Sequence, residues 1–149
     1  MMRTLIVEDD AFKAKQIESE VRDTLPGGEV FHASSLQQAV EALGGHRYEF
    51  VILDMAIPSH SEEGGSADVY SQPIGGLDVL LYLALDNRDE KVIILTQYPT
   101  VEYNRQHTPL AKLKSRLELD GISNLSEISL FGEDGKWKAR LRDFLESGQ

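Results

Sequence analysis

The sequence predicts an α/β protein whose five parallel strands form one doubly wound sheet with helices on both faces. Two observations predict this fold: short apolar runs rich in β-branched residues alternate with amphipathic stretches, and the alternation occurs five times. The unit is therefore (βα)5, and we expect the strand order 2-1-3-4-5. With 149 residues the chain has the length of one domain, which we expect to cover residues 1–149.

Five apolar segments are expected to form the strands. They cover residues 4–7, 29–33, 50–53, 91–96 and 127–131. The third segment is apolar at every position, as expected for a strand that is covered on both faces.

The first two helices are predicted from helical spacing and from capping residues. The helix at residues 11–25 has a buried face of four apolar residues, Ala14, Ile17, Val21 and Leu25. Ser35 and Gln38 form a capping box before the second helix, and Gly44-Gly45 ends it.

The later helices are separated by longer stretches. The third is expected to begin at Gly76 and to bury Leu77, Leu80, Leu81 and Ala84. Thr108 as the cap and Pro109 at the first helical position predict the start of the fourth, and the last runs from Lys136 to about Glu146. Residues 59–72 and 97–107 show no periodicity, so two long loops are expected there.

The charge balance favours metal ions and cationic partners over nucleic acids. The formal net charge is −10, and phosphate contacts dominate nucleic-acid affinity. Basic residues cluster at 112–116 and 136–142, but leucines interleave with them, which favours solvated helix faces. The chain has no cysteine, and we expect no signal peptide and no membrane span. We therefore expect a cytoplasmic protein that binds neither nucleic acid nor membrane.

Acidic residues follow two of the expected strands. Glu8 and Asp9 follow the first strand, and Asp54 follows the third. In the order 2-1-3-4-5 the carboxyl ends of these strands flank the point where the order reverses, so three carboxylates are expected to converge there. Such oxygen ligands suit Mg²⁺, and an aspartate can accept a phosphoryl group covalently. Thr96, at the end of the fourth strand, is placed to bond that phosphate.

A simpler interpretation is that an acid after a strand only caps the next helix, as either Asp9 or Asp10 could do. One such acid would favour capping. Acids after both the first and the third strand, with a hydroxyl after the fourth, favour a functional pocket instead.

In these features the sequence resembles the receiver domain of bacterial two-component response regulators, a CheY-like family with a flavodoxin-like fold. The resemblance is close over residues 1–58 and 76–96 and looser after Thr96. It is carried by Leu-Ile-Val-Glu-Asp-Asp at 5–10, Val-Ile-Leu-Asp-Met at 51–55, Pro58, Gly76-Leu77 and Ile-Ile-Leu-Thr at 93–96.

The resemblance implies that Asp54 is the phosphoacceptor and that a histidine kinase or phosphotransfer protein charges it. Asp9 would bind Mg²⁺ directly and Glu8 through water, with Asp54 and the backbone carbonyl of Ala56 as further ligands. Thr96 matches the switch hydroxyl that follows the phosphate. Such a domain catalyses at most its own phosphorylation and dephosphorylation and is otherwise no enzyme. It signals because the phosphoryl group shifts the population between two conformations of the domain.

The chain departs from the family at three places. The family's lysine at the end of the fifth strand has no counterpart among residues 128–130, and Lys136 downstream is better explained as the start of a helix. The loop after Pro58 is longer than usual and should lie over the acids, as a lid or a partner contact from which His60, Glu62, Glu63 and Asp68 could reach a metal. A mobile, solvated loop without such a role is an equally good interpretation. The segment after Thr96 is also longer, and Phe131 is the candidate for the family's switching aromatic.

Three functions follow from these observations. The first is a stand-alone receiver, phosphorylated at Asp54, that binds an unknown downstream protein, with a homodimer as a further candidate assembly. The alternative is a phosphorylation-independent pseudo-receiver that serves as an interaction module, which the missing lysine motivates. The third is a Mg²⁺-dependent phosphohydrolase, which the sequence disfavours because Ala56 stands where a second acid is needed.

Overall fold

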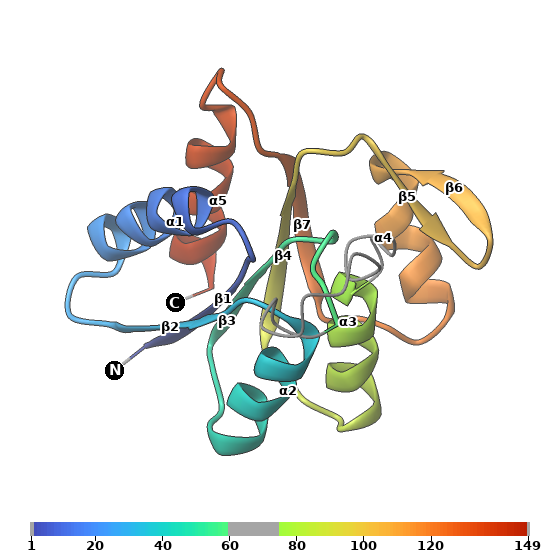
Figure 1. Cartoon of the computed structure of the whole chain (residues 1–149), viewed down its shortest axis with the longest axis horizontal. Helices are drawn as coiled ribbons and strands as arrows, with labels where there is room; N and C mark the ends of the chain where they lie inside the picture. Colours follow the sequence, from blue (N-terminus) through green and yellow to red (C-terminus); the bar gives the residue numbers. More distant parts are fainter. Residues whose placement is uncertain (1, 60–74, 149) are drawn as a thin grey trace.

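A computed structural model describes residues 2–59 and 75–148, which form a central sheet between two layers of helices (Figure 1). The sheet contains five parallel strands in the order β2-β1-β3-β4-β7. These are β1 (Arg3–Val7), β2 (Glu29–Ala33), β3 (Phe50–Leu53), β4 (Lys91–Thr96) and β7 (Leu125–Leu130). Because β7 is the fifth strand of this sheet along the chain, the predicted fold and strand order are confirmed.

Each face of the sheet has its own helix layer. Helices α1 (Ala11–Thr24) and α5 (Lys136–Ser147) lie side by side on one face. Helices α2 (Leu36–Gly45), α3 (Gly75–Leu85) and α4 (Leu110–Leu119) cover the other. Successive strand residues point to opposite faces, so Ile6 and Ile52 pack under α1 and α5 while Leu5 and Val51 pack under the other layer.

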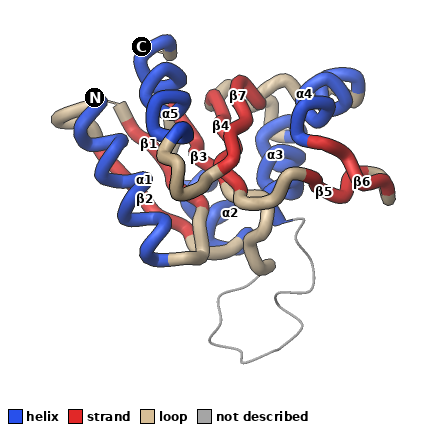
Figure 2. Tube along the Cα trace, turned by 90° about the horizontal axis from the view of Figure 1, so that it is seen from above, coloured by secondary structure: helices blue, strands red, loops and turns tan. Residues whose placement is uncertain are grey.

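The segment after β4 differs from the predicted loop. Residues 97–107 contain β5 (Thr100–Tyr103), which pairs antiparallel with β6 (Gln106–Pro109) in a hairpin next to α4 (Figure 2). The turn is formed by Asn104 and Arg105 at positive φ, 51° and 64°. The prediction of an irregular stretch there was wrong, because an arginine at positive φ is not a turn signal in a sequence.

Two side-chain predictions near the helices also fail. Thr108 lies in β6 and does not cap α4, whose N-cap position is Pro109 and has no side-chain cap. Leu81 is 42% exposed, because Val79, Leu80 and Leu83 form the buried face of α3. The Ser35 cap of α2 is confirmed, since its hydroxyl accepts the Gln38 N–H at 3.1 Å.

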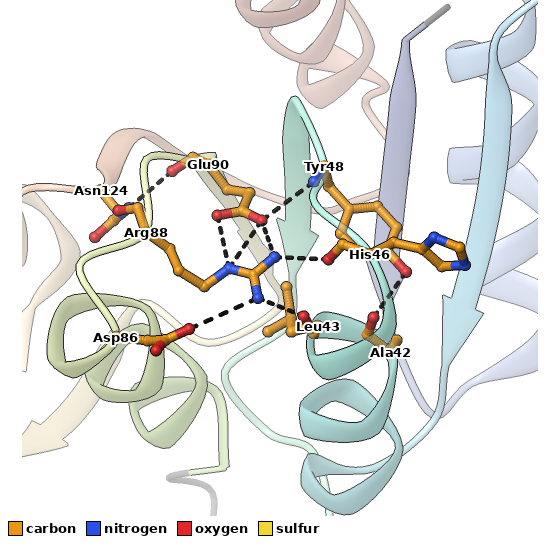
Figure 3. A network of polar contacts seen from close by, with 8 residues as sticks. All are labelled: Ala42, Leu43, His46, Tyr48, Asp86, Arg88, Glu90 and Asn124. Carbon is orange, nitrogen blue, oxygen red and sulfur yellow. Dashed lines mark hydrogen bonds and ion pairs between the residues drawn. The ribbon is translucent and has the colours of Figure 1, made fainter.

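A buried polar network ties together the loops at the amino ends of β3, β4 and β7 (Figure 3). The Arg88 guanidinium pairs with the Glu90 carboxylate and donates to the backbone carbonyls of Leu43 and His46. The Asn124 amide donates to the carbonyls of Arg88 and Glu90, at 2.8 and 2.9 Å. The network lies at the amino ends of these strands, whereas the acidic residues follow the carboxyl ends of β1 and β3. Its role is therefore to join the loops at the amino ends.

In the described part of the chain, no helix is both long and apolar enough to cross a membrane.

Candidate functional site

The carboxyl ends of β1 and β3 bring three acidic side chains together. Because Val7 pairs with Leu53 in the parallel ladder, Glu8 and Asp9 lie beside Asp54. Each of the three offers a carboxylate oxygen, and these oxygens lie within 4.8 Å of one another. We call these three carboxylates the acid pocket. Glu8 and Asp54 are buried, and Asp9 is half-buried.

Backbone hydrogen bonds hold these residues in place. The Asp54 N–H donates to the Val7 carbonyl at 3.0 Å, and the Glu8 N–H donates to the Ala33 carbonyl at 2.9 Å. Both bonds continue the pairing of the sheet by one residue. The acids are therefore positioned by the rigid sheet rather than by a loop.

Asp10 is the residue that caps α1. Its carboxylate accepts the N–H groups of Phe12 and Lys13, at 2.9 and 3.3 Å, and its own N–H donates to Glu8 Oε2 at 3.1 Å. The two alternatives left by the sequence are thereby separated. Asp10 serves the helix, and Asp9 belongs to the acid pocket.

A lysine that the sequence interpretation overlooked lies inside the acid pocket. Lys13 is 1% exposed, and its Nζ lies 2.7 Å from Glu8 Oε1 and 3.6 Å from Asp54 Oδ1. It also donates to the Leu95 carbonyl at 2.9 Å. A sequence signal did exist: Lys13 precedes Ile17 by four residues, which places it on the buried face of α1.

Burial and the charge of Asp54 raise the proton affinity of Glu8 and Asp9. Loss of solvation, and then the charge of Asp54, raise the pKa of Glu8 to about 8, although Lys13 acts to lower it. The 2.7 Å ion pair alone would favour the carboxylate, but burial prevails because one ammonium is shared with Asp54. Burial also raises the pKa of Asp9, and the charge of Asp54 adds to this effect.

The acid pocket has the donor set of a magnesium site. Its ligands are hard carboxylate oxygens at few positions, which leave room for water and a phosphate. Glu8 Oε1 and Asp54 Oδ1 are buried, and the partner that the structure gives them is the Lys13 ammonium, at 2.7 and 3.6 Å. One ammonium beside three carboxylates leaves negative charge that a further cation would offset. The Ala56 carbonyl as a further ligand stays a prediction.

The segment after Asp54 packs tightly against the start of α3. The Gly76 N–H donates to the Met55 carbonyl at 3.2 Å. A Cβ on Gly76 would lie 2.6 Å from the Asp54 carbonyl oxygen and 2.7 Å from Met55 Cα. Only glycine permits this close approach, which fixes the backbone that carries Asp54.

Thr96 ends β4, the neighbour of β3, and is 1% exposed. Its hydroxyl oxygen accepts the Tyr98 N–H at 3.3 Å. Thr96 pairs with Leu130 at the end of β7, and the Phe131 N–H donates to the Thr96 carbonyl at 2.8 Å. The predicted hydroxyl thus lies, like the acids, at the carboxyl ends of the strands. Of the predicted loop residues that would reach a metal, His60, Glu62, Glu63 and Asp68 all lie outside the described residues.

Comparison with known proteins identifies the family. No family model matches the chain. The chain is 34% identical over 147 residues to the Detocs response regulatory protein DtcB of Vibrio alginolyticus, covering 96% of this chain and 99% of DtcB. It belongs to the response regulators. An uncharacterized protein of Sinorhizobium fredii, y4jR, is 27% identical to this response regulator over 100 residues, 66% of each chain.

Solved structures share the fold of this response regulator. TrrA from Thermotoga maritima, in complex with Mg²⁺-BeF, has a TM-score of 0.64 at 21% identity and matches over the full length of both chains. The receiver domain of a putative LuxO repressor from Vibrio parahaemolyticus has a TM-score of 0.66 at 21% identity, over 99% of this chain and 92% of that one. A CheY-like receiver domain from Methylobacillus flagellatus has a TM-score of 0.64 at 17% identity, over 100% and 99%. The chain therefore has the fold of these receiver domains.

Proposed function

We propose that this receiver accepts a phosphoryl group on Asp54 with the help of Mg²⁺ and signals by binding another protein. The observation that carries the proposal is the acid pocket, in which Asp54 at the end of β3 has carboxylate oxygens of Glu8 and Asp9 within 4.8 Å. Membership of the response regulators supports it, as does the fold shared with TrrA, whose structure contains Mg²⁺ and BeF. DtcB, a response regulatory protein, is matched over 99% of its length.

The residues that would hold the ion are Glu8, Asp9 and Asp54, with the Ala56 carbonyl as a further ligand. When bound, Mg²⁺ would supply positive charge that offsets the charge on the oxygens of the transferring phosphoryl group. Asp9 is the least buried of the three acids and is the natural side for entry of the hydrated ion.

The reaction is a phosphoryl transfer to a carboxylate. An oxygen of Asp54 forms a bond to phosphorus, while the bond from phosphorus to the donor's nitrogen or oxygen breaks and leaves its electron pair on the donor. Asp54 then carries a phosphoryl dianion in place of one negative charge. The Thr96 oxygen accepts the Tyr98 N–H, which leaves the hydroxyl hydrogen available for a phosphoryl oxygen.

The proposed donor is a histidine kinase or phosphotransfer protein of the cytoplasm, and the protein is a phosphoacceptor rather than an enzyme of repeated turnover. The proposed downstream partner is a protein. A groove of about 620 Å³ between α4, β7 and α5, where Leu130 is 49% exposed, is the face we assign to it.

Incubation with acetyl phosphate and Mg²⁺, followed by intact mass spectrometry, tests the proposal. The wild type should gain the mass of one phosphoryl group, and chelation of Mg²⁺ should abolish the gain. Asp54→Asn should gain nothing, whereas Asp23→Asn, on the exposed side of α1, should behave as wild type. An adduct that persists in Asp54→Asn contradicts the proposal.

The alternative is a pseudo-receiver that binds its partner without phosphorylation. It is favoured by one observation: no lysine occurs from Leu125 to Phe131, at the end of the fifth strand. Beryllium fluoride separates the two functions, because it imitates the phosphoryl group on an aspartate. Partner binding that changes strongly with Mg²⁺ and beryllium fluoride excludes the pseudo-receiver, and binding that does not change supports it.

A further inference from the structure

Lys13 projects from the first turn of α1 into the acid pocket. A buried ammonium loses its hydration, which costs on the order of several kcal/mol unless partners replace the water. Here the partners are the Leu95 carbonyl at 2.9 Å and the carboxylates of Glu8 and Asp54 at 2.7 and 3.6 Å. Among the described residues, no other lysine or arginine forms an ion pair with the acid pocket. The residue is therefore part of the site.

The end of the fifth strand carries no lysine at residues 128–130, where a receiver would have one, and an aromatic ring comes directly after it. β7 ends at Leu130 opposite Thr96, and Phe131 follows. The Phe131 ring lies beneath the Lys13 ammonium, with its centroid 5.0 Å from Nζ. Lys136, the nearest lysine downstream, is exposed and lines the groove between α4, β7 and α5 instead. Among the described residues, the ammonium that pairs with Asp54 therefore comes from α1 and not from the end of β7.

We infer that Lys13 supplies, from α1, the cation that binds the phosphoryl group on Asp54. This inference rests on the proposed function and names the residue that completes its site. When phosphorylation of Asp54 turns one negative charge into two, attraction shifts the ammonium from Glu8 toward the phosphoryl oxygens. A charge-assisted hydrogen bond to such an oxygen is stronger than one to a neutral acceptor, so Lys13 also stabilises the transfer itself.

The same lysine is connected to α5 through two stacked rings. Its ammonium lies over Phe131, and Phe131 stacks on Trp137 with ring centroids 4.7 Å apart. Trp137 is the sole tryptophan and is 2% exposed in the core beneath α5. Movement of Lys13 toward a phosphoryl group removes a cation from the Phe131 face. Tryptophan fluorescence should therefore respond to ligand at Asp54.

The test uses Lys13→Met, which keeps the length of the side chain without its charge, and Lys13→Gln, which can still donate to the Leu95 carbonyl. Lys15→Met is the matched control, because Lys15 is exposed on the same helix, α1. For each variant, calorimetry measures Mg²⁺ affinity and then beryllium fluoride affinity at saturating Mg²⁺, and mass spectrometry measures the rate of phosphorylation by acetyl phosphate.

Both Lys13 variants should bind Mg²⁺ at least as tightly as wild type, because a competing cation has been removed from Glu8 and Asp54. Their beryllium fluoride affinity and phosphorylation rate should fall by roughly 100-fold, the usual effect of losing one charged contact to the reacting group. Lys15→Met should match wild type in all three measurements. The Mg²⁺ titration shows whether the acid pocket of each variant is folded. If Lys13→Met does not fold, the values for Lys13→Gln test the role of Lys13.

A second variant relocates the charge. Phe131→Lys combined with Lys13→Met places a lysine where the ring now contacts the ammonium, and it should restore most of the lost beryllium fluoride affinity. Wild-type values in both Lys13 variants, or an equal loss in Lys15→Met, overturn the inference while leaving Asp54 as phosphoacceptor. If the wild type itself is not phosphorylated and does not bind beryllium fluoride, the proposed function fails first.

Discussion

Replacing Arg88 with methionine removes the cation at the centre of the buried network that lies at the amino ends of β3, β4 and β7. The guanidinium Nε lies 3.1 Å from both carboxylate oxygens of Glu90, and Nη2 donates to the His46 carbonyl at 2.7 Å. Glu90 is 1% exposed, and without Arg88 its carboxylate keeps the Tyr48 N–H at 3.1 Å. The variant therefore leaves a buried charge without a counterion.

The size of the effect follows from that burial. Removing one partner of a buried ion pair costs about 3–5 kcal/mol, against at most about 1 kcal/mol for an exposed pair. For a chain of this length, about 2–4 °C of melting temperature corresponds to each kcal/mol, so Arg88→Met should melt roughly 6–20 °C lower. Arg88→Met with Glu90→Met should lose less than the sum of the single variants, because the second change removes the unpaired charge.

Thermal and urea denaturation of the four proteins in this cycle measure the coupling. Burial acts to raise the pKa of Glu90, but hydrogen bonds from Arg88 and the Tyr48 N–H outweigh it and lower the pKa. The pair therefore stabilises the fold above the ordinary glutamate pKa, and the difference between wild type and Arg88→Met should shrink as the pH falls below about 4. A loss under about 1 kcal/mol at pH 7 refutes this reasoning. Phosphorylation of the folded variant should be unchanged, since the acid pocket lies at the other end of the strands, after the carboxyl ends of β1 and β3.

Three further predictions concern the site itself. Gly76→Ala forces a methyl group against the Asp54 backbone, so it should lose about 1–3 kcal/mol and slow phosphorylation, whereas Gly44→Ala, with nothing within 4 Å of its Cβ, should do neither. Asp10→Ala should lose about 1 kcal/mol in urea denaturation through its α1 cap, and an equal loss in Asp10→Asn would contradict capping as the cause. Because burial raises the pKa of Glu8 to about 8, Mg²⁺ must displace a proton, so calorimetry should show affinity rising by up to roughly tenfold per pH unit below 8. The metal-free protein should correspondingly lose stability as pH rises toward 8, and a flat profile in both would contradict the raised pKa.

The parts of the fold that depend on apolar periodicity were predictable from the sequence. Strands buried on both faces are apolar throughout, which makes them recognisable in a sequence. The parallel order then placed Glu8, Asp9 and Asp54 together at the carboxyl ends of neighbouring strands. The hairpin β5–β6 was missed because its strands contain few apolar residues and its turn places Arg105 at positive φ. In that case tertiary packing against α4 decides the structure.

Lys13 was missed for a different physical reason. A pattern of apolar and polar positions assigns a lysine to solvent, and only the assembled sheet shows that the first turn of α1 faces three carboxylates. The sequence does reveal that the fifth strand lacks the lysine of the receiver family. That absence indicates that another element supplies the positive charge beside Asp54. The spacing of Lys13 from Ile17 would have identified that element.

A crystal structure of the wild type with Mg²⁺ and beryllium fluoride tests the account most directly. The account predicts beryllium bonded to a carboxylate oxygen of Asp54, Mg²⁺ on Glu8, Asp9 and Asp54, and the Lys13 ammonium on a fluorine. Beryllium fluoride bound elsewhere, or bound to Asp54 while Lys13 stays on Glu8 and another cation contacts the fluorines, would contradict it.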